Sequence, residues 1–150
     1  MGNQTLEMNQ KATTTNEHDI GLSADRSGDI VIISLISGDP SPSLGHGSGA
    51  HRFRFTLQDS TGLNVQFASL DTQDNWSSCP PPGGDNSGQI SGVQMHNNPP
   101  LPRNAAFTDN NSNPSSSGPM DVCYQWNFTC DDQNVTVRPY DPIIRNGGTP

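Results

Sequence analysis

The sequence predicts an all-β protein, a two-sheet antiparallel β-sandwich of the Ig-like or jelly-roll-like type, with long loops and a flexible N-terminal arm. Three observations predict it. Apolar and polar residues alternate with a period of two in several short segments. Clusters of Gly, Pro, Asn and Asp separate these segments. Helical periodicity nowhere exceeds about two turns, and about seven short strands divided by turns are typical of a sandwich.

The length and composition predict a single domain. Of the 150 residues, only 29% are hydrophobic, and 15 Gly and 13 Pro favour loops. A second autonomous core in so short a chain would bury too little surface to offset its chain entropy. We therefore expect one sandwich domain over residues 29–150. Residues 1–28 are polar and aperiodic, which predicts a flexible arm.

The first half of the chain contains three predicted strands. Residues 29–37 are apolar on both faces, which indicates a central strand or one whose second face meets a partner. Residues 51–58 alternate strictly, as expected of a half-buried strand. Residues 64–70 follow a turn at 59–62, and the two segments are expected to form a hairpin with a longer loop. The inward side chains of the second strand are His51, Phe53, Phe55 and Leu57.

The second half contains the clearest strand, residues 121–130. We expect weaker strands at residues 89–95 and 105–108. A turn leads into residues 134–140, predicted to complete a second hairpin, and residues 143–144 are expected to form an edge strand. The long segments 71–88 and 96–119 either carry the activity or hide further elements. One face of the clearest strand carries Val122, Tyr124, Trp126, Phe128 and Cys130.

The charge balance excludes some partners. There are 15 Asp and Glu against 7 Lys and Arg, a formal net charge of −8. Nucleic acids and anionic membranes are bound mainly through Lys and Arg, so neither is an expected partner. No run approaches the roughly 20 apolar residues of a membrane helix. The N-terminus has no basic start followed by an apolar stretch, and we expect a cytoplasmic location.

The cysteines predict neither a disulfide framework nor a zinc knuckle. Cys79, Cys123 and Cys130 are odd in number and contain no C-x-x-C pair. Cys123 and Cys130 share a predicted strand, which would separate their Cα atoms by roughly 23 Å, and a disulfide allows about 7 Å. We expect Cys130 to be a small buried apolar residue, and Cys79 to lie in a loop.

Signatures of catalysis are mostly absent. The stretch Gly45–Gly49 resembles a nucleophile elbow, but His46 stands where G-x-S-x-G requires Gly. A triad of Ser48, His46 or His51, and Asp39 can be drawn. Gly-rich flexibility opposes the preorganisation that such a site needs, so we predict no enzyme. His51 is expected to be a satisfied histidine at the edge of the core.

Residues 109–113 begin like a calcium loop, with oxygen-bearing side chains at the first, third and fifth positions. The pattern then fails, because Pro114 occupies the position of the required Gly and Met120 that of the bidentate Glu. The prediction is therefore no cofactor, with calcium as the alternative. The candidate ligands are Asp109, Asn111 and Asp121, or the pair Asp131 and Asp132.

Trp76 is the candidate ligand-binding residue. It stands in a polar stretch beside Asp74 and Asn75. A flat aromatic ring flanked by carboxylates and amides suits the recognition of sugars or proteins. The alternative is a Trp76 side chain folded back as a lid over one end of the sandwich.

The C-terminal segment Tyr124-x-Trp126-x-Phe128, followed by Tyr140-Asp141-Pro142-x-Ile144, resembles the ending of the small bacterial inclusion-body protein family and the DP-EP group. The resemblance covers only about the last thirty residues. It implies a cytoplasmic β-sandwich without known catalysis, often abundant or self-associating. The ending Asn146-Gly147-Gly148 departs from that pattern, and no binding residues are transferred.

These observations predict a non-enzymatic protein with a structural, self-assembly or protein-interaction role. Its expected partner is itself or another protein. The alternative is a lectin-like module for carbohydrate or another small ligand, assisted by calcium, that uses Trp76 and the Asp/Asn-rich loops. A hydrolase built on Ser48 is the third hypothesis.

Overall fold

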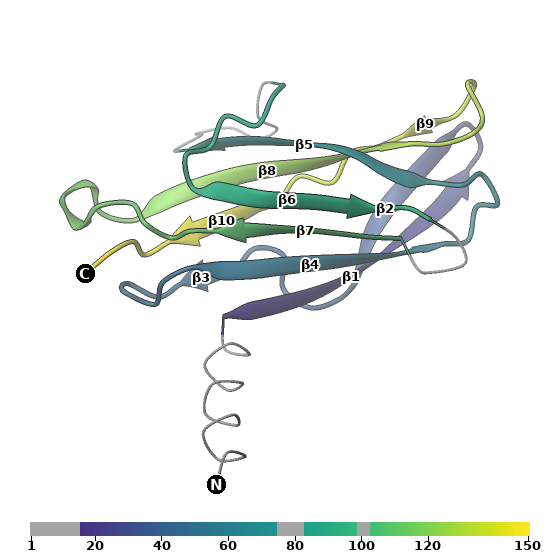
Figure 1. Cartoon of the computed structure of the whole chain (residues 1–150). Coiled ribbons are helices and arrows are strands. Elements are labelled where there is room, and N and C mark those ends of the chain that lie inside the picture. Colours follow the sequence, from purple (N-terminus) through teal and green to yellow (C-terminus); the bar gives the residue numbers. More distant parts are fainter. Residues whose placement is uncertain (1–15, 75–82, 99–102) are drawn as a thin grey trace, which may run out of the picture.

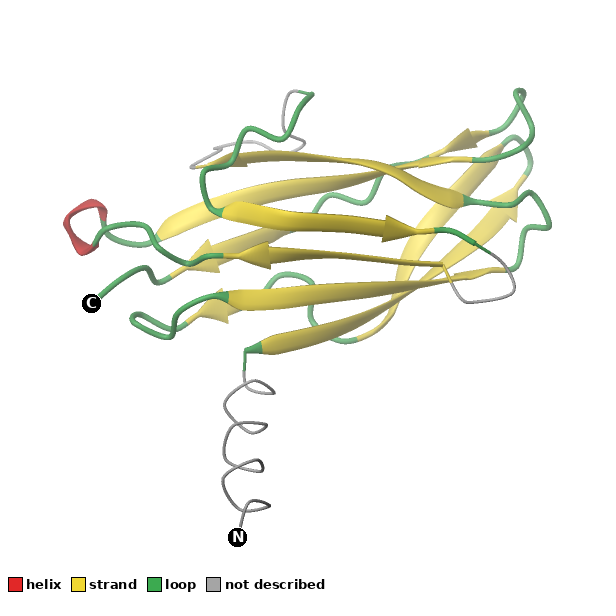
Figure 2. Ribbon diagram, viewed as in Figure 1, coloured by secondary structure: helices red, strands yellow, loops and turns green. Residues whose placement is uncertain are grey.

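The computed structural model describes residues 16–74, 83–98 and 103–150. Two β-sheets face each other around an apolar core (Figures 1 and 2). The strands are β1 (Glu17–Ser27), β2 (Ile30–Ser37), β3 (Ser43–Leu44), β4 (His51–Asp59), β5 (Gln66–Asp74), β6 (Ile90–His96), β7 (Arg103–Asp109), β8 (Met120–Thr129), β9 (Thr136–Val137) and β10 (Ile143–Asn146). A 3-10 turn, η1 (Ser115–Ser117), precedes β8.

The all-β class and the two sheets are confirmed, but the purely antiparallel arrangement is wrong. The six-stranded sheet has the order β6-β7-β4-β1-β2-β9, and the four-stranded sheet has the order β3-β10-β8-β5. The pairs β1–β4, β2–β9 and β3–β10 are parallel. The remaining pairs are antiparallel, so both sheets are mixed.

The predicted flexible arm, residues 1–28, contains a strand in the middle of the six-stranded sheet. β1 lies between β2 and β4 and directs Ile20, Leu22 and Ala24 into the core. These three side chains follow the period of two, but small and polar residues separate them. The prediction of an arm up to residue 28 is therefore wrong over Glu17–Ser27.

The first predicted hairpin is wrong in its pairing, and the second is confirmed only at one bridge. β4 belongs to the six-stranded sheet and β5 to the four-stranded sheet, so the chain crosses between sheets at this corner. The Asp59 carboxylate builds the corner by accepting from the backbone N–H groups of Thr61 (2.9 Å) and Val65 (2.8 Å). In the second predicted hairpin, β9 pairs with β2, and only Tyr140 pairs antiparallel with β8, at Trp126. Turn residues thus predicted where the chain bends but not which strand it joins.

The strands β2, β4 and β8 lie where the sequence predicts them. β10 covers the predicted edge strand at residues 143–144, but it lies between β3 and β8 and buries Ile144 completely. Cys130 has a free thiol and Cys123 is disulfide-bonded, so these two cysteines do not pair, as predicted. The sequence predicted no disulfide framework, and the disulfide-bonded Cys123 corrects this prediction. The cytoplasmic location stays a prediction. Cys79 lies outside the described residues.

Aromatic rings join the two sheets at the centre of the core. Phe55 of β4 meets Trp126 and Tyr124 of β8 edge-on, with ring centroids 5.6 and 5.9 Å apart. Phe67 of β5 meets Trp126 at 5.2 Å. The aromatic face predicted for residues 121–130 is therefore the face that seals the core.

In the described part of the chain, no helix has the length and apolar character needed to cross a membrane.

Candidate functional site

The predicted ligand-binding residue Trp76 and its neighbour Asn75 lie outside the described residues. Asp74 ends β5, and its carboxylate accepts hydrogen bonds from the Ser87 hydroxyl and from the Gly88 N–H (2.9 Å). In this position Asp74 fixes the segment before β6 against β5. Its oxygens are engaged within the chain.

Two of the three candidate calcium ligands come together, and the third does not. The Asn111 N–H donates to Asp109 Oδ1 (3.0 Å). Asp121 instead forms an ion pair with Arg145 (3.0 Å) on the face of β8 opposite to the buried Val122. Among the described residues, no group of three or more His, Cys, Asp or Glu side chains is placed to hold a metal ion. The calcium site of Asp109, Asn111 and Asp121, and its alternative at Asp131 and Asp132, stay predictions.

Four fully buried polar residues form what we call the polar end: Asp109, Asn111, Asn113 and Asn146. Asn146 Nδ2 donates to Asp109 Oδ1 (2.7 Å), and the Gly148 N–H donates to Asn111 Oδ1 (2.8 Å). These bonds join the loop after β7 to the C-terminal segment. Within the described chain, the buried oxygens Asp109 Oδ2, Asn113 Oδ1 and Asn146 Oδ1 have no hydrogen-bond donor. Burial raises the pKa of the Asp109 carboxyl to about 6.

A chain of hydrogen bonds lies beside the polar end, where β4 begins. Ser48 Oγ is 2.8 Å from His51 Nε2, and His51 Nδ1 is 3.0 Å from His18 Nε2. Asn111 Nδ2 donates to Ser48 Oγ (3.1 Å), which connects this chain to the polar end. The His18 ring stacks on Phe53, with centroids 4.4 Å apart and planes inclined by 9°. We call Ser48, His51 and His18 the serine–histidine chain.

The structure brings together part of the triad drawn from the sequence. Ser48 and His51 meet, and His51 lies at the core edge as predicted, only 6% exposed. His46 Nδ1 instead lies 3.0 Å from the Gly147 carbonyl oxygen, and Asp39 accepts from the Ser41 N–H (2.9 Å). His18 is not among the site residues predicted from the sequence. Its signal was its position two residues before Ile20, on the inward face of β1.

Burial determines the charge of both histidines. It lowers the pKa of His51, and the nearby His18 lowers it further. Burial also lowers the pKa of His18, although the carboxylates of Asp39 and Asp19 oppose this effect. Both imidazoles are therefore neutral at physiological pH, and each ring carries one N–H donor and one nitrogen acceptor.

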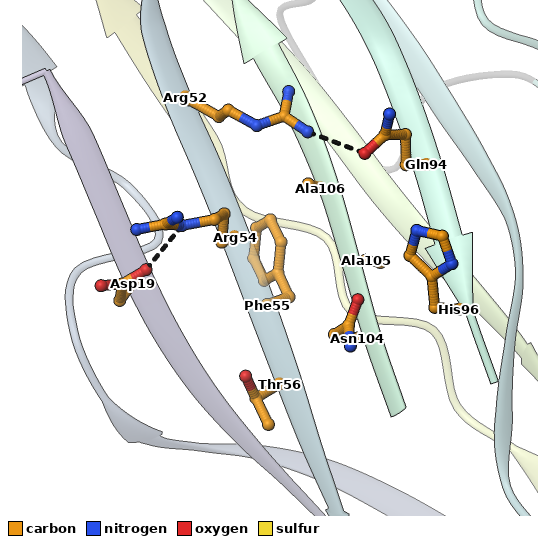
Figure 3. A pocket seen from close by; sticks show the side chains of 10 residues that line it. All are labelled: Asp19, Arg52, Arg54, Phe55, Thr56, Gln94, His96, Asn104, Ala105 and Ala106. Carbon is orange, nitrogen blue, oxygen red and sulfur yellow. Dashed lines mark hydrogen bonds and ion pairs between the residues drawn. The ribbon is translucent and has the colours of Figure 1, made fainter. Parts of the chain in front are cut away.

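The outer face of the six-stranded sheet has a cavity of about 340 Å³ (Figure 3). Arg52 donates to Gln94 Oε1 (3.0 Å) and to Thr108 Oγ1 (3.1 Å). Arg54 forms ion pairs with Glu17 (3.2 Å) and Asp19 (3.0 Å). The residues lining the cavity are Asp19, Arg52, Arg54, Phe55, Thr56, Gln94, His96, Asn104, Ala105 and Ala106.

The second half of β2 exposes apolar side chains at one edge of the six-stranded sheet. Ile32, Leu35 and Ile36 are 42%, 46% and 49% exposed. On the edge away from β1, the two-residue strand β9 pairs only with Ile30 and Val31. Beyond Val31, no described strand pairs with this edge. We call Ile32–Ser37 the open edge.

The comparisons with known proteins give no relative for these sites. The chain matches no protein-family model and no curated protein. The resemblance of its last thirty or so residues to the inclusion-body and DP-EP proteins stays a prediction.

Proposed function

We propose that the protein acts by self-association, in which a second copy of the chain pairs with the open edge of β2. The observation that carries this proposal is the exposure of Ile32, Leu35 and Ile36 beside backbone that β9 leaves unpaired. An uncovered edge strand is a template for another strand, because its N–H and C=O groups have no partner. This proposal also accounts for the two apolar faces that the sequence shows in this segment.

The chemistry of β2 favours a second copy as the partner. Its eight residues include no charged residue and no proline, the two features that usually protect an edge. The chain as a whole has a net charge of −8, so two copies repel each other over most surfaces but not here. Two identical strands can pair antiparallel about a two-fold axis, and each then covers the apolar side chains of the other. The resemblance to self-associating proteins points in the same direction.

The other edge of the six-stranded sheet is less suited to this role. β6 has a register shift between Ser91 and Gln94, and Gly92 within it has φ +61°. Such a bulge twists an edge away from a regular ladder. In contrast, β2 pairs with β1 without interruption from Ile30 to Leu35.

Replacing Ile32 with lysine is expected to convert the associated protein into a monomer. A charge at the open edge would have to be desolvated in the interface, which weakens association at least about tenfold. Sedimentation equilibrium over a range of concentrations measures this change. Because Ile32 is exposed, the stability of the monomer should change by less than about 0.5 kcal/mol.

Met95→Lys is the matched control, since Met95 is an exposed apolar residue of β6, 37% exposed. This variant should associate as the wild type does. A wild-type chain that stays monomeric at high concentration contradicts the proposal. So does an Ile32→Lys variant that associates as strongly as the wild type.

A second candidate function is the binding of a polar small ligand, such as a carbohydrate, in the outer-face cavity. Planar polar side chains from four strands line this cavity, among them Arg52, Gln94 and Asn104. Convergent donors and acceptors of this kind suit ligand hydroxyls. Of the residues predicted for this function from the sequence, Asp74 does not line the cavity, and Asn75 and Trp76 lie outside the described residues.

Arg52→Gln is expected to weaken glycan binding about tenfold or more, because it removes a charged donor from the cavity. A glycan array, run with calcium and again with a chelator, identifies the ligand and tests the calcium alternative. Titration calorimetry then compares the variants. Arg26→Gln is the control, since Arg26 bonds the Gly28 carbonyl at the end of β1. A silent array with the wild-type chain removes this candidate.

A further inference from the structure

We propose that the serine–histidine chain is an acyl-transfer site for carboxylic esters, with Ser48 as nucleophile, His51 as general base and His18 as the residue that positions His51. This proposal does not depend on self-association. The serine–histidine chain lies at the start of β4, whereas the open edge belongs to β2. Either proposal can therefore fail without the other.

The distances match those of a nucleophile, a base and an orienting group. The 2.8 Å from Ser48 Oγ to His51 Nε2 lies within the range of about 2.6–3.2 Å for a nucleophile and its base. The second nitrogen, His51 Nδ1, meets His18 Nε2 at 3.0 Å. A base whose far nitrogen is held by a third group is the arrangement of a catalytic triad. Here an imidazole stands in the place of the usual carboxylate.

The Ser48 hydroxyl has two acceptors within reach, the Gly45 carbonyl oxygen (2.7 Å) and His51 Nε2 (2.8 Å), and the catalytic arrangement is the one in which its proton points to His51. For His51 Nε2 to accept the Ser48 proton, Nδ1 must carry the ring proton of His51. That N–H then donates to His18 Nε2, and His18 carries its own proton on Nδ1. Each ring then has a single proton, in agreement with the lowered pKa of both histidines. Stacking on Phe53 keeps the His18 ring in this orientation.

Ser48 lies on a fixed platform although its neighbours are glycines. The fully buried Asn111 donates through Nδ2 to Ser48 Oγ and to the carbonyl oxygens of Gly45 (3.1 Å) and Gly49 (3.2 Å). Asn111 is itself held by the Gly148 N–H. The buried Asn111 side chain therefore holds the Gly-rich stretch in the fixed position that a catalytic site needs.

The position of Ser48 also allows a substrate to approach. Ser48 is exposed and His51 lies buried beneath it. Gly49 follows Ser48, and a side chain added there would meet no atom within 4 Å. The backbone next to Ser48 therefore leaves open space at Gly49.

The reaction balances with an ester and water alone. Ser48 Oγ forms a bond to the ester carbonyl carbon as its proton passes to His51 Nε2. The bond from that carbon to the alkoxy oxygen breaks, and the leaving oxygen takes the proton from His51, which releases an alcohol and leaves an acyl group on Ser48. Water, deprotonated by His51, then releases the carboxylic acid and restores the hydroxyl.

The direct test is labelling of the full wild-type chain with an alkyl fluorophosphonate, followed by peptide mass spectrometry. The probe should modify Ser48 in preference to every other serine. Ser48→Ala should lose both the label and the turnover of p-nitrophenyl acetate, about 100-fold or more. Ser41→Ala, an exposed serine of the same region, is the matched control and should keep both.

The histidine variants separate the base from the positioning residue. His51→Gln should lower acylation of Ser48 about 100-fold. His18→Gln should lower it less and move the midpoint of the pH–rate profile upward, because His18 lowers the pKa of His51. The ionisable groups around His51 are His18 on β1, Asp109 opposite it on β7 and, near His18, Asp39 and Asp19.

Wild-type protein in which Ser48 is labelled no faster than other serines overturns the proposal, and this result needs no variant to fold. Equal labelling of wild type and a folded His51→Gln overturns the role of the base. An unmoved pH profile in His18→Gln overturns the positioning role. The monomeric Ile32→Lys variant should be labelled as fast as the wild type.

Discussion

Replacing Trp126 with alanine is expected to lower the free energy of unfolding by about 4 kcal/mol, the largest effect of any change considered. Trp126 is fully buried, and its ring meets those of Phe55, Phe67 and Phe107 from both sheets. Alanine would leave a cavity between the two layers, because strands paired on both sides cannot collapse into it. Urea unfolding followed by far-UV circular dichroism measures the loss.

The matched variant is Trp126→Phe, expected to cost less than about 1.5 kcal/mol. The Trp126 Nε1–H is buried and has no acceptor within the described chain. Phenylalanine keeps most of the ring contacts and removes this unsatisfied donor, so the two effects partly offset each other. If phenylalanine costs as much as alanine, the ring contacts are not what stabilises this core.

Replacing Asp109 with asparagine is expected to raise the free energy of unfolding by about 2 kcal/mol near pH 7.5. Burial raises the pKa of the Asp109 carboxyl from 3.8 to about 6, so the folded chain keeps a proton that the unfolded chain releases. The stability that this group contributes is complete below about pH 4 and is lost as the pH rises through about 6. Asparagine remains neutral throughout and removes this loss.

The amide introduced by Asp109→Asn can keep the existing contacts, since its oxygen still accepts from the Asn111 N–H and from Asn146 Nδ2. The histidines act in the opposite sense: the lowered pKa of His18 and His51 makes stability fall as the pH drops below about 6.5. Thermal unfolding of both proteins between about pH 4 and 8 isolates the Asp109 contribution. Asp121→Asn, at a partly exposed carboxylate, is the control. An Asp109→Asn variant less stable than the wild type at high pH contradicts the prediction.

Local patterning predicted the strands whose side chains alternate strongly. The stripe that contains Tyr124, Trp126 and Phe128 and the alternation after His51 identified β8 and β4 nearly to the residue. β1 was missed because its inward residues include a histidine and an alanine, which weaken the apolar signal. Pairing between strands could not be read in the same way. Turn residues act over a few positions only. β1 pairs with β4 although β2 and β3 lie between them in the sequence, so no turn could predict this pair.

In the candidate site too, contacts between residues close in sequence could be predicted, and contacts between distant residues could not. Ser48 and His51 lie three residues apart, and their proximity could be proposed from the sequence. His18 is 33 residues from His51, and only the parallel register of β1 against β4 places it there. The polar end likewise joins Asp109 to Asn146, 37 residues later. Contacts of this kind depend on the topology, which no local pattern of side chains specifies.

The central place of β10 in the four-stranded sheet has a consequence for biosynthesis. β3 reaches β8 only through β10, so this sheet cannot close until residues 143–146 have left the ribosome. Until then β8 and β3 present unsatisfied backbone to the surrounding solution. Nascent chains of this protein should therefore stay accessible to chaperones and acquire protease resistance only after β10 emerges.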